Sequence, residues 1–459
     1  MTMLFPFQKR GVESINNCKG RCLLADQMGM GKSIQSITWA VNYLDRYPII
    51  VICPASLKSN WEREWITHVK IKPCILESTK PHSLDSPTSR VYIINYDVLH
   101  AWLGVLKSIK PSLIILDECH YLAGRGTRRT RSAKYLCHGV PHVIGLSGTP
   151  LTNRPADLFS TLNIIRPDLF PYYSPYAWEY CGRRKTIWGW DDRGARNLDK
   201  LHRELKDNLL IRRVKEDVLE ELPPKIRTVV LLQLDNMKEY VKAEKNFLSW
   251  LGEEGRRTQT NFKREQRTQL IHLKKLVGEL KLSAVKRWIN SHLEEVEEKT
   301  LVFAHHVNVV DTLYEEYEDL AVMVNGSVTG KKRQREFDIF NNKKSVRLFV
   351  GNIKAAGVGW NAKHTSTVAF AELPWTPGEV TQAEDRPHGI SRGVAGKPLN
   401  VYFLIAKGTI EEDLARIIQR KSRIAGYAID GVKRRGDLDV YSLLTDKIKK
   451  RTKDIKSSI

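Results

Sequence analysis

The sequence lacks any cysteine pair at the spacing of a metal or disulfide motif. Its seven cysteines are scattered over 459 residues without a CxxC, and no histidine cluster lies beside Cys18 and Cys22, the closest two. We therefore expect neither a zinc site nor a disulfide framework, since reduced intracellular thiols explain this usage more simply. The chain also lacks an apolar signal segment and any apolar run long enough to cross a bilayer. These absences predict an intracellular protein, cytosolic or in whichever compartment holds its ligand, without a membrane partner.

The chain has a large excess of positive over negative side chains. Lysine and arginine total 74 against 52 aspartate and glutamate, which gives a net charge of +22. Basic residues recur along the chain, at Arg125–Arg131, Arg183–Lys185, Lys331–Arg335 and Lys447–Lys453. Such a surplus favours a polyanionic partner, because each neutralised phosphate releases bound counterions. Nucleic acid is the partner that this pattern predicts, and a device for solubility is the alternative.

Short apolar runs alternate with helical patterns in two parts of the chain. This alternation is typical of βαβ units around a parallel sheet. From Pro167 to about Lys299 the chain is helical in pattern, charged and aromatic, and from Glu411 it is helical with a lysine-rich tail. The predicted strands are Cys22–Ala25, Ile49–Cys53, Val91–Asn95, Leu113–Leu116, Val143–Leu146, Leu301–Ala304, Ala321–Val324, Val346–Val350, Thr367–Phe370 and Val401–Ile405.

The predicted fold class is therefore α/β, with two parallel-sheet lobes. The expected divisions are residues 1–166 for the first lobe, 167–298 for its end and a helical insertion, 299–410 for the second lobe, and 411–459 for a C-terminal helix and basic tail.

A glycine-rich loop, Asp26–Ser33, lies between a predicted strand and a predicted helix, which is the setting that a phosphate-binding loop requires. Its glycines let the backbone N–H groups face phosphate oxygens, Lys32 would reach the β- and γ-phosphates of ATP, and Ser33 would bind Mg²⁺. Asp26 stands where such loops usually have their first glycine. The predicted nucleotide-binding residues are Asp26, Gln27, Met28, Gly29, Met30, Gly31, Lys32 and Ser33.

An acidic pair, Asp117 and Glu118, follows the apolar run Leu113–Leu116. A carboxylate at the end of a strand can hold Mg²⁺, and the next glutamate can orient and deprotonate the attacking water. A solvated loop is the alternative. Because a phosphate loop precedes this pair in the chain, the two together predict ATP hydrolysis. Gln8 has one amide donor and one acceptor for the adenine edge, although alone it is only a surface glutamine.

Together with further motifs, these residues resemble the superfamily 2 helicases, more narrowly the Swi/Snf-type DNA translocases, and within those the annealing-helicase branch. The resemblance covers nearly the whole chain and implies two RecA-like lobes, helical insertions between them and a C-terminal brace helix. It also adds Gly359 to the nucleotide site. The matching segments include Cys53–Leu57 with Asn60, Trp61 and Trp65, Asp117–His120, Leu146–Pro150, Trp188–Asp191, Arg212–Leu219, Ala355–Asn361 and Gln382–Arg386.

The resemblance implies that ATP bound to one lobe is completed by arginines of the other. Arg386 would be the trans-acting arginine finger, and its alternative is a structural arginine paired with Glu384 or Asp385. The second arginine of the family motif is Gly389 here. We hypothesise that Arg392, about one helical turn further on, takes its place. If Arg392 does not take its place, either Arg386 alone is enough for ATP hydrolysis, or the motor is slow or defective.

The resemblance also implies which residues contact DNA. Small hydroxyls and backbone N–H groups suit phosphate contacts, which position the strand without reading its sequence. The aromatic residue among them would stack on a sugar or base, and a core aromatic is its alternative. The expected contacts are Ser56 and Lys58 from the first lobe and Gly326, Ser327, Asn352 and Trp375 from the second.

The predicted function is translocation on double-stranded or forked DNA, driven by ATP with Mg²⁺, to remodel forks or displace proteins in replication, recombination or repair. The alternatives are a strand-separating DNA or RNA helicase and a nucleotide-gated DNA clamp with weak hydrolysis, which Gly389 favours. The chain begins almost at Gln8, so we expect the substrate-binding modules of the annealing-helicase relatives to be absent or to be supplied by a protein partner. A compact motor of this kind suits a phage or viral system in the host cytoplasm, or the nucleus of a eukaryote.

Overall fold

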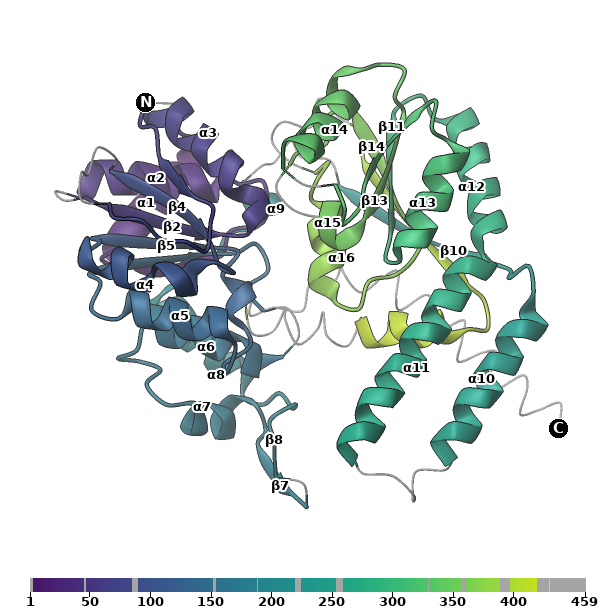
Figure 1. The fold of residues 1–459 in the computed structure, drawn as a ribbon, viewed down its shortest axis with the longest axis horizontal. Helices are drawn as coiled ribbons and strands as arrows, with labels where there is room; N and C mark the ends of the chain where they lie inside the picture. Colours follow the sequence, from purple (N-terminus) through teal and green to yellow (C-terminus); the bar gives the residue numbers. More distant parts are fainter. Residues whose placement is uncertain are drawn as a thin grey trace. The chain divides into compact units, whose positions relative to one another are not determined.

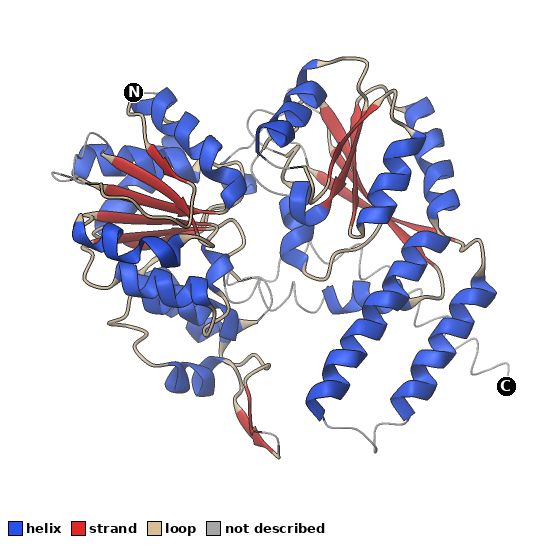
Figure 2. Cartoon of the chain, viewed as in Figure 1, coloured by secondary structure: helices blue, strands red, loops and turns tan. Residues whose placement is uncertain are grey.

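The structure is a computed structural model that describes residues 3–44, 47–84, 90–151, 154–187, 189–218, 224–252, 259–328, 330–356, 360–388, 397–418 and 429. The described residues form two compact units, residues 3–218 with Ile429 and residues 224–418, which we call lobe 1 and lobe 2. Each has its own parallel sheet with helices on both faces (Figures 1 and 2), so the predicted α/β class with two lobes is confirmed. Gly359, Gly389, Arg392 and Trp188 lie outside the described residues.

Lobe 1 is built on a seven-stranded parallel sheet with the order β3-β4-β2-β5-β6-β1-β9. Its central strands are buried along almost their whole length, which is why they appear in the sequence as continuous apolar runs. The strands are β1 (Arg21–Leu24), β2 (Ile49–Cys53), β3 (Cys74–Leu76), β4 (Val91–Asn95), β5 (Leu113–Asp117), β6 (His142–Leu146) and β9 (Leu210–Ile211).

Two groups of helices cover this sheet. Helices α1 (Pro6–Asn17), α2 (Lys32–Tyr43) and α3 (Lys58–Val69) lie on one face, and α4 (Leu99–Ser108), α5 (Arg128–Cys137) and α6 (Pro155–Ile165) lie on the other (Figure 1). They bury four indole rings almost completely, those of Trp39, Trp61, Trp65 and Trp102. The remaining elements of lobe 1 are η1 (Ala55–Leu57), η2 (Cys119–Leu122), α7 (Tyr173–Tyr180), the antiparallel strands β7 (Arg184–Thr186) and β8 (Gly189–Asp191), α8 (Leu198–Asn208) and α9 (Lys215–Val218).

Lobe 2 is built on a six-stranded parallel sheet with the order β10-β15-β14-β11-β13-β12. Its strands are β10 (Lys225–Leu232), β11 (Lys299–Ala304), β12 (Ala321–Val324), β13 (Leu348–Asn352), β14 (Thr365–Phe370) and β15 (Leu399–Ala406). Its helices are α10 (Met237–Gly252), α11 (Gln259–Leu280), α12 (Leu282–Glu295), α13 (Val307–Glu316), α14 (Gly330–Asn342), α15 (Ile353–Ala356) and α16 (Pro377–Glu384). Residues 410–418 are also helical, at the start of the expected brace helix.

The stretch between the lobes is less uniformly helical than the sequence suggested. Helices α10, α11 and α12 lie where helix was predicted, but β10 and the β7–β8 hairpin were missed. β10 is an edge strand that pairs along its full length with β15, and all its residues are partly buried or exposed except the last, Leu232, which is buried. Charged residues at Lys225 and Arg227 interrupt its apolar character, and both are needed for ion pairs inside lobe 2. None of the helices in the described ranges is long and apolar enough to cross a membrane.

Candidate functional site

The glycine-rich loop and the acidic pair lie at the same edge of the lobe 1 sheet. Leu24 at the end of β1 is in register with Leu146 of β6, and Leu146 is in register with Asp117 of β5. Only one strand therefore separates Asp117 from the strand that leads into Asp26. Since parallel strands end at a common edge, this is the edge where α/β sheets bind their ligands.

The loop is folded around the ammonium group of Lys32. Gly29 and Gly31 have φ angles of 80° and 74°, in the left-handed region that favours glycine, and Gly31 is the N-cap of α2. Lys32 Nζ donates to the carbonyl oxygens of Asp26 at 2.9 Å and Gln27 at 3.3 Å. Burial lowers the pKa of Lys32, and the charges of Glu118, Asp26 and Asp117 oppose this shift. The N-terminus of α2 and this ammonium group together favour an anion at the loop.

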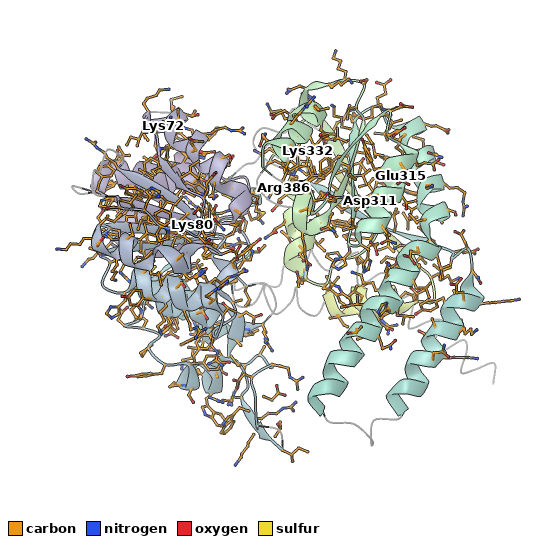
Figure 3. The ribbon with its side chains drawn as sticks, viewed as in Figure 1. Lys72, Lys80, Asp311, Glu315, Lys332 and Arg386 are labelled. Atoms are coloured by element: carbon orange, nitrogen blue, oxygen red, sulfur yellow. The ribbon has the colours of Figure 1, made fainter. Side chains whose placement is uncertain are left out.

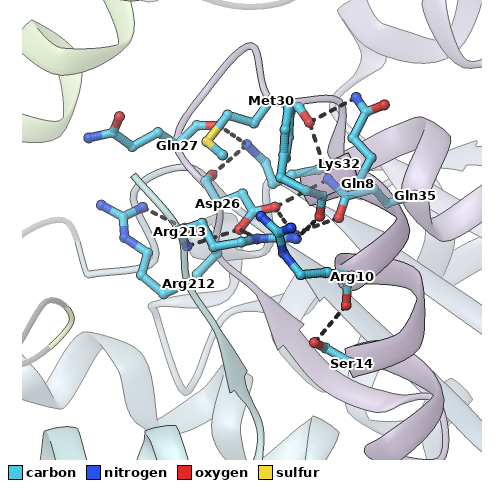
Figure 4. A network of polar contacts seen from close by, with 12 residues as sticks. Gln8, Arg10, Ser14, Asp26, Gln27, Met30, Lys32, Gln35, Arg212 and Arg213 are labelled. Atoms are coloured by element: carbon cyan, nitrogen blue, oxygen red, sulfur yellow. Dashed lines mark hydrogen bonds and ion pairs between the residues drawn. The ribbon is translucent and has the colours of Figure 1, made fainter. Parts of the chain in front are cut away.

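The unusual Asp26 is explained by a buried ion pair with Arg213 (Figure 4). Its carboxylate is fully buried, and Oδ1 accepts hydrogen bonds from both the backbone N–H and the Nε of Arg213, each at 3.0 Å. Arg213 Nη2 donates to Asp26 Oδ2 and, at 2.7 Å, to Gln35 Oε1. Gln35 Nε2 in turn donates to Asp26 Oδ2 at 3.2 Å and to the Met30 carbonyl at 3.1 Å. The network fixes both ends of the loop.

The segment after β9 makes further hydrogen bonds that hold the phosphate loop and its neighbours. Arg212 Nη1 donates to the carbonyl oxygens of Ala25 and, at 3.0 Å, Gly148, while Gln27 Oε1 accepts from the Lys215 N–H at 2.8 Å. In the sequence, the segment that contains Arg212 and Arg213 was recognised only as one of those that match the family. The signal for its second role was Asp26 itself, because a carboxylate inside such a loop needs a cation.

The acidic pair is held by donors from two neighbouring elements. Trp61 Nε1 of α3 donates to Asp117 Oδ2 at 2.7 Å, and the Glu118 N–H donates to Oδ1 at 3.0 Å. The Tyr96 hydroxyl donates to the Asp117 carbonyl oxygen at 2.8 Å. Burial, and then the charge of Glu118, raise the pKa of Asp117 to about 7, against the effects of Trp61 and Lys32. A cation beside this carboxylate would counteract both causes of that shift.

His120 connects the acidic pair to the segment that follows β6. Its Nδ1 lies 3.2 Å from Glu118 Oε2 and 3.1 Å from the Ser147 hydroxyl. The same hydroxyl accepts a hydrogen bond from the Thr149 N–H at 3.2 Å. Polar contacts through His120 therefore connect Glu118 to the loop at Ser147–Thr149. This loop also contacts the phosphate loop, because a Cβ added to Gly148 would lie 2.5 Å from Met28 Cγ.

A magnesium ion fits the chemistry of this edge. Among the described residues, no group of three or more histidine, cysteine, aspartate or glutamate side chains is arranged to hold a metal ion. Ser33 and Asp117 offer the hard oxygen ligands that Mg²⁺ prefers, and its other ligands would come from nucleotide phosphates and water. This is the usual division for a nucleotide-bound ion.

Gln8 contacts the loop directly. Its Oε1 accepts from the Phe5 N–H at 3.0 Å, and its Nε2 donates to the Met30 carbonyl at 3.3 Å. The side chain is 5% exposed, so it is not the surface glutamine of the alternative interpretation. Its amide joins the start of α1 to the phosphate loop, and reading of adenine by this amide stays a prediction.

Arg386 follows α16 in lobe 2 (Figure 3), and its side chain is buried. Its Nε donates to the Gln382 carbonyl at 3.0 Å and its Nη1 to the Trp360 carbonyl at 2.9 Å. The two acids before it have other cations: Arg227 makes a paired contact with Glu384 at 2.9 and 2.7 Å, and Lys225 lies 2.8 Å from Asp385. Its role as a finger toward ATP stays a prediction.

The expected DNA contacts of lobe 1 lie at the start of α3. Ser56 is exposed in η1, as a phosphate contact requires. Lys58 is partly buried, its Nζ donates to the Leu76 carbonyl at 3.3 Å, and burial lowers its pKa.

The expected DNA contacts of lobe 2 differ in their exposure and in the hydrogen bonds that they make within the lobe. Gly326 and Ser327 are exposed after β12, and the Ser327 hydroxyl donates to Asn325 Oδ1 at 2.6 Å. The amide of Asn352 is engaged internally: its Nδ2 donates to the His305 carbonyl at 2.6 Å, and its Oδ1 accepts from the Lys354 N–H at 3.1 Å. Asn352 therefore shapes the turn after β13.

The surroundings of Trp375 have features of both predicted roles, a DNA-stacking aromatic and a core aromatic. Its ring is partly buried and packs against the lobe 2 core, and Lys274 Nζ of α11 lies 4.5 Å from the ring centroid. One face of the indole is therefore occupied by a cation from the helical insertion.

Comparison with models of known protein families shows to which family the chain belongs. A model of the SNF2-related domain matches residues 7–300, and a model of the helicase conserved C-terminal domain matches residues 280–390. The chain belongs to the SNF2 family. The resemblance inferred from the motifs is thereby confirmed, as are the two-lobed fold and the assignment to helicase superfamily 2.

Relatives of this SNF2-family chain support the same conclusion. It is 33% identical to the SWI/SNF-related matrix-associated actin-dependent regulator of chromatin subfamily A-like protein 1 of Xenopus tropicalis, over 93% of this chain and 45% of that protein. It is 32% identical to the human DNA annealing helicase and endonuclease ZRANB3, over 96% of this chain and 42% of that protein. The chain thus spans less than half the length of these relatives.

A solved structure is also similar. The Sulfolobus solfataricus SWI2/SNF2 ATPase core in complex with dsDNA is 23% identical, with a TM-score of 0.44, over 93% of this chain and 94% of that chain.

Proposed function

We propose that this SNF2-family chain hydrolyses ATP and uses the energy to translocate on double-stranded DNA. One observation carries the proposal: Lys32 lies at the same edge of the lobe 1 sheet as Asp117 and Glu118, with one strand between them, and is held by the loop's own carbonyl oxygens. This is the set of groups that phosphoryl transfer to water requires.

Each of these residues has a distinct role in the proposed reaction. Lys32 and the N–H groups at the start of α2 bind the β- and γ-phosphates, and Asp117 with Ser33 holds Mg²⁺. A Mg²⁺ ion held by Asp117 and Ser33 would neutralise charge on the transferring phosphoryl group. Glu118 orients the attacking water and accepts its proton. Arg386, with Arg392 in place of the missing second arginine, supplies positive charge to the same group from lobe 2.

The proposed substrate is double-stranded or forked DNA, bound without sequence preference through Ser56, Lys58, Gly326, Ser327 and Trp375. The net charge of +22 supports a polyanion, and relatives are named as a DNA annealing helicase and as a regulator of chromatin. Fork remodelling or protein displacement in replication, recombination or repair would be the use of such a motor. We propose that the protein acts where its DNA is, and that a protein partner supplies targeting.

The test is steady-state ATP hydrolysis at fixed low salt, measured without nucleic acid and with duplex DNA, forked DNA, single-stranded DNA or RNA. Stimulation by duplex or forked DNA that is lost in Lys32→Ala supports the proposal, and displacement of a third strand from a triplex then reports translocation. Stimulation mainly by RNA or single strands would favour the strand-separating helicase. DNA binding without turnover on any substrate would favour the nucleotide-gated clamp.

A further inference from the structure

Lobe 1 carries a short antiparallel hairpin, β7–β8, that does not join either large sheet. It extends from α7 away from the lobe 1 sheet (Figure 1). Its register pairs are Arg184 with Asp191, Lys185 with Trp190, and Thr186 with Gly189. Directly opposed residues point to the same side of a hairpin, so Lys185 and Trp190 share one face and the Arg184–Asp191 ion pair lies on the other.

The face with Trp190 is aromatic and exposed. Trp190 is 52% exposed, Trp178 of α7 is 49% exposed, and Ile187, directly after β7, is 89% exposed. The two indole rings meet edge to face with their centroids 5.4 Å apart, and the Arg183 guanidinium lies 4.6 Å from the Trp190 centroid. Such large apolar side chains are normally buried, and a cluster of them in solvent marks a binding surface.

The base of the hairpin is fixed even though this face is exposed. The Tyr173 hydroxyl donates to Asp192 Oδ2 at 3.0 Å, and Arg183 Nη1 donates to the Ser174 hydroxyl at 2.9 Å. Gly194 packs so closely that an added Cβ would lie 2.7 Å from the Cys181 carbonyl oxygen. The rings are therefore presented on a held support, which reduces the entropy lost when they bind a partner.

The charge of this segment identifies the partner. Residues 183–196 contain five basic and two acidic side chains, a net charge of +3. The exposed Lys185 shares the face of Trp190, and Arg183 lies against its ring, whereas Arg184 and Arg193 pair with Asp191 on the other face. Basic groups around open aromatic faces are the combination that binds single-stranded nucleic acid, since unpaired bases stack on the rings while cations follow the phosphates. Bases in a duplex are already stacked on one another and present no free face to an indole.

We propose that the β7–β8 hairpin binds single-stranded DNA, with an unpaired base stacked on Trp190 beside Trp178. The inference rests on the proposed function, because a motor on duplex DNA meets single strands at forks and gaps. It adds a second contact that gives the motor a preference for branched DNA.

The test is fluorescence anisotropy of a labelled short oligo(dT) and of a blunt duplex of the same length, on the full chain at fixed low salt without nucleotide. Trp190→Ala is expected to weaken oligo(dT) binding about tenfold, the size of one base–indole stack, and to change duplex binding less than about twofold. Trp190→Phe keeps a ring face and is expected to retain most of the affinity. Tyr135→Ala, an exposed aromatic on α5, is the matched control.

Thermal unfolding of each variant shows whether the hairpin change disturbs the fold. Unchanged oligo(dT) binding in Trp190→Ala, an equal loss for both DNAs, or no binding of oligo(dT) by the wild type would each overturn the proposal. The surface would then fit a protein partner. Duplex-stimulated ATP hydrolysis of the wild type is measured in the same preparation, so that failure of the proposed motor function is seen separately from failure of the hairpin.

Discussion

The indole Nε1 of Trp61 donates a 2.7 Å hydrogen bond to Oδ2 of Asp117, the proposed ligand of Mg²⁺. Trp61 is almost fully buried, and its hydrogen bond favours the ionised carboxylate, which counteracts the burial that raises the pKa of Asp117 to about 7. Helix α3 thus contributes to the acidic pair, although its motif was recognised for neighbouring DNA contacts.

Trp61→Phe is therefore expected to raise the Mg²⁺ concentration for half-maximal ATP hydrolysis about tenfold near pH 7, since loss of a hydrogen bond to a charged group costs about 1.5–3 kcal/mol. The protonated form of Asp117 competes with the metal, so the defect should shrink as the pH rises above 7. A Mg²⁺ titration at two pH values measures this. Trp65→Phe is the control, because Trp65 is also fully buried on α3 and its Nε1 has no hydrogen-bond partner among the described residues.

Arg213→Met should leave the buried carboxylate of Asp26 without its cation. Removing one partner of a buried ion pair costs about 3–5 kcal/mol, so we expect a marked fall in the midpoint of thermal unfolding together with weaker ATP binding. The double variant Asp26→Ala/Arg213→Met removes both charges and should recover part of the lost stability. A double variant no more stable than Arg213→Met would show that the pair does not act as a unit.

Two buried lysines of lobe 2 should respond in opposite directions to the same substitution. Lys274 is fully buried, its Nζ has no hydrogen-bond partner within the described ranges, and burial lowers its pKa to about 8 against the charges of Glu372, Glu411 and Glu379. Lys281, equally buried, donates to both oxygens of Glu411 at 2.7 Å.

Lys274→Met is therefore expected to stabilise the protein below pH 8, by on the order of 2–3 kcal/mol. A lysine whose folded pKa is lowered binds fewer protons folded than unfolded, so wild-type stability should rise between about pH 8 and 10, and the advantage of the variant should fade there. Lys281→Met should instead destabilise the protein, because it removes the cation that pairs with the buried carboxylate of Glu411. Denaturant unfolding across this pH range measures both, and stabilisation by Lys281→Met would contradict the assignment.

The sequence predicted the parts of the fold in which local pattern and burial agree. The central strands β2 and β4 were placed residue for residue, because strands buried on both faces are continuous apolar runs. β10 was missed because its charged residues serve ion pairs with Glu384 and Asp385, which are distant in sequence. The loop, Lys32 and the acidic pair were found from short motifs. Arg213 and Trp61 were not given their roles, since these depend on contacts over 187 and 56 positions.

Glu118 and Lys32 should separate chemistry from binding at the proposed site. Glu118→Gln keeps the shape of the side chain but removes the proton acceptor, so we expect hydrolysis to fall about 10²–10⁴-fold, with ATP affinity changed less than about threefold. Lys32→Ala removes the ammonium group at the phosphates and should weaken ATP binding itself. Phosphate release under saturating ATP and binding of a fluorescent ATP analogue measure the two effects. If Glu118→Gln lost nucleotide binding while its turnover at saturation stayed near wild type, Glu118 would be a structural residue of the His120–Ser147 network and the attacking water would have another base.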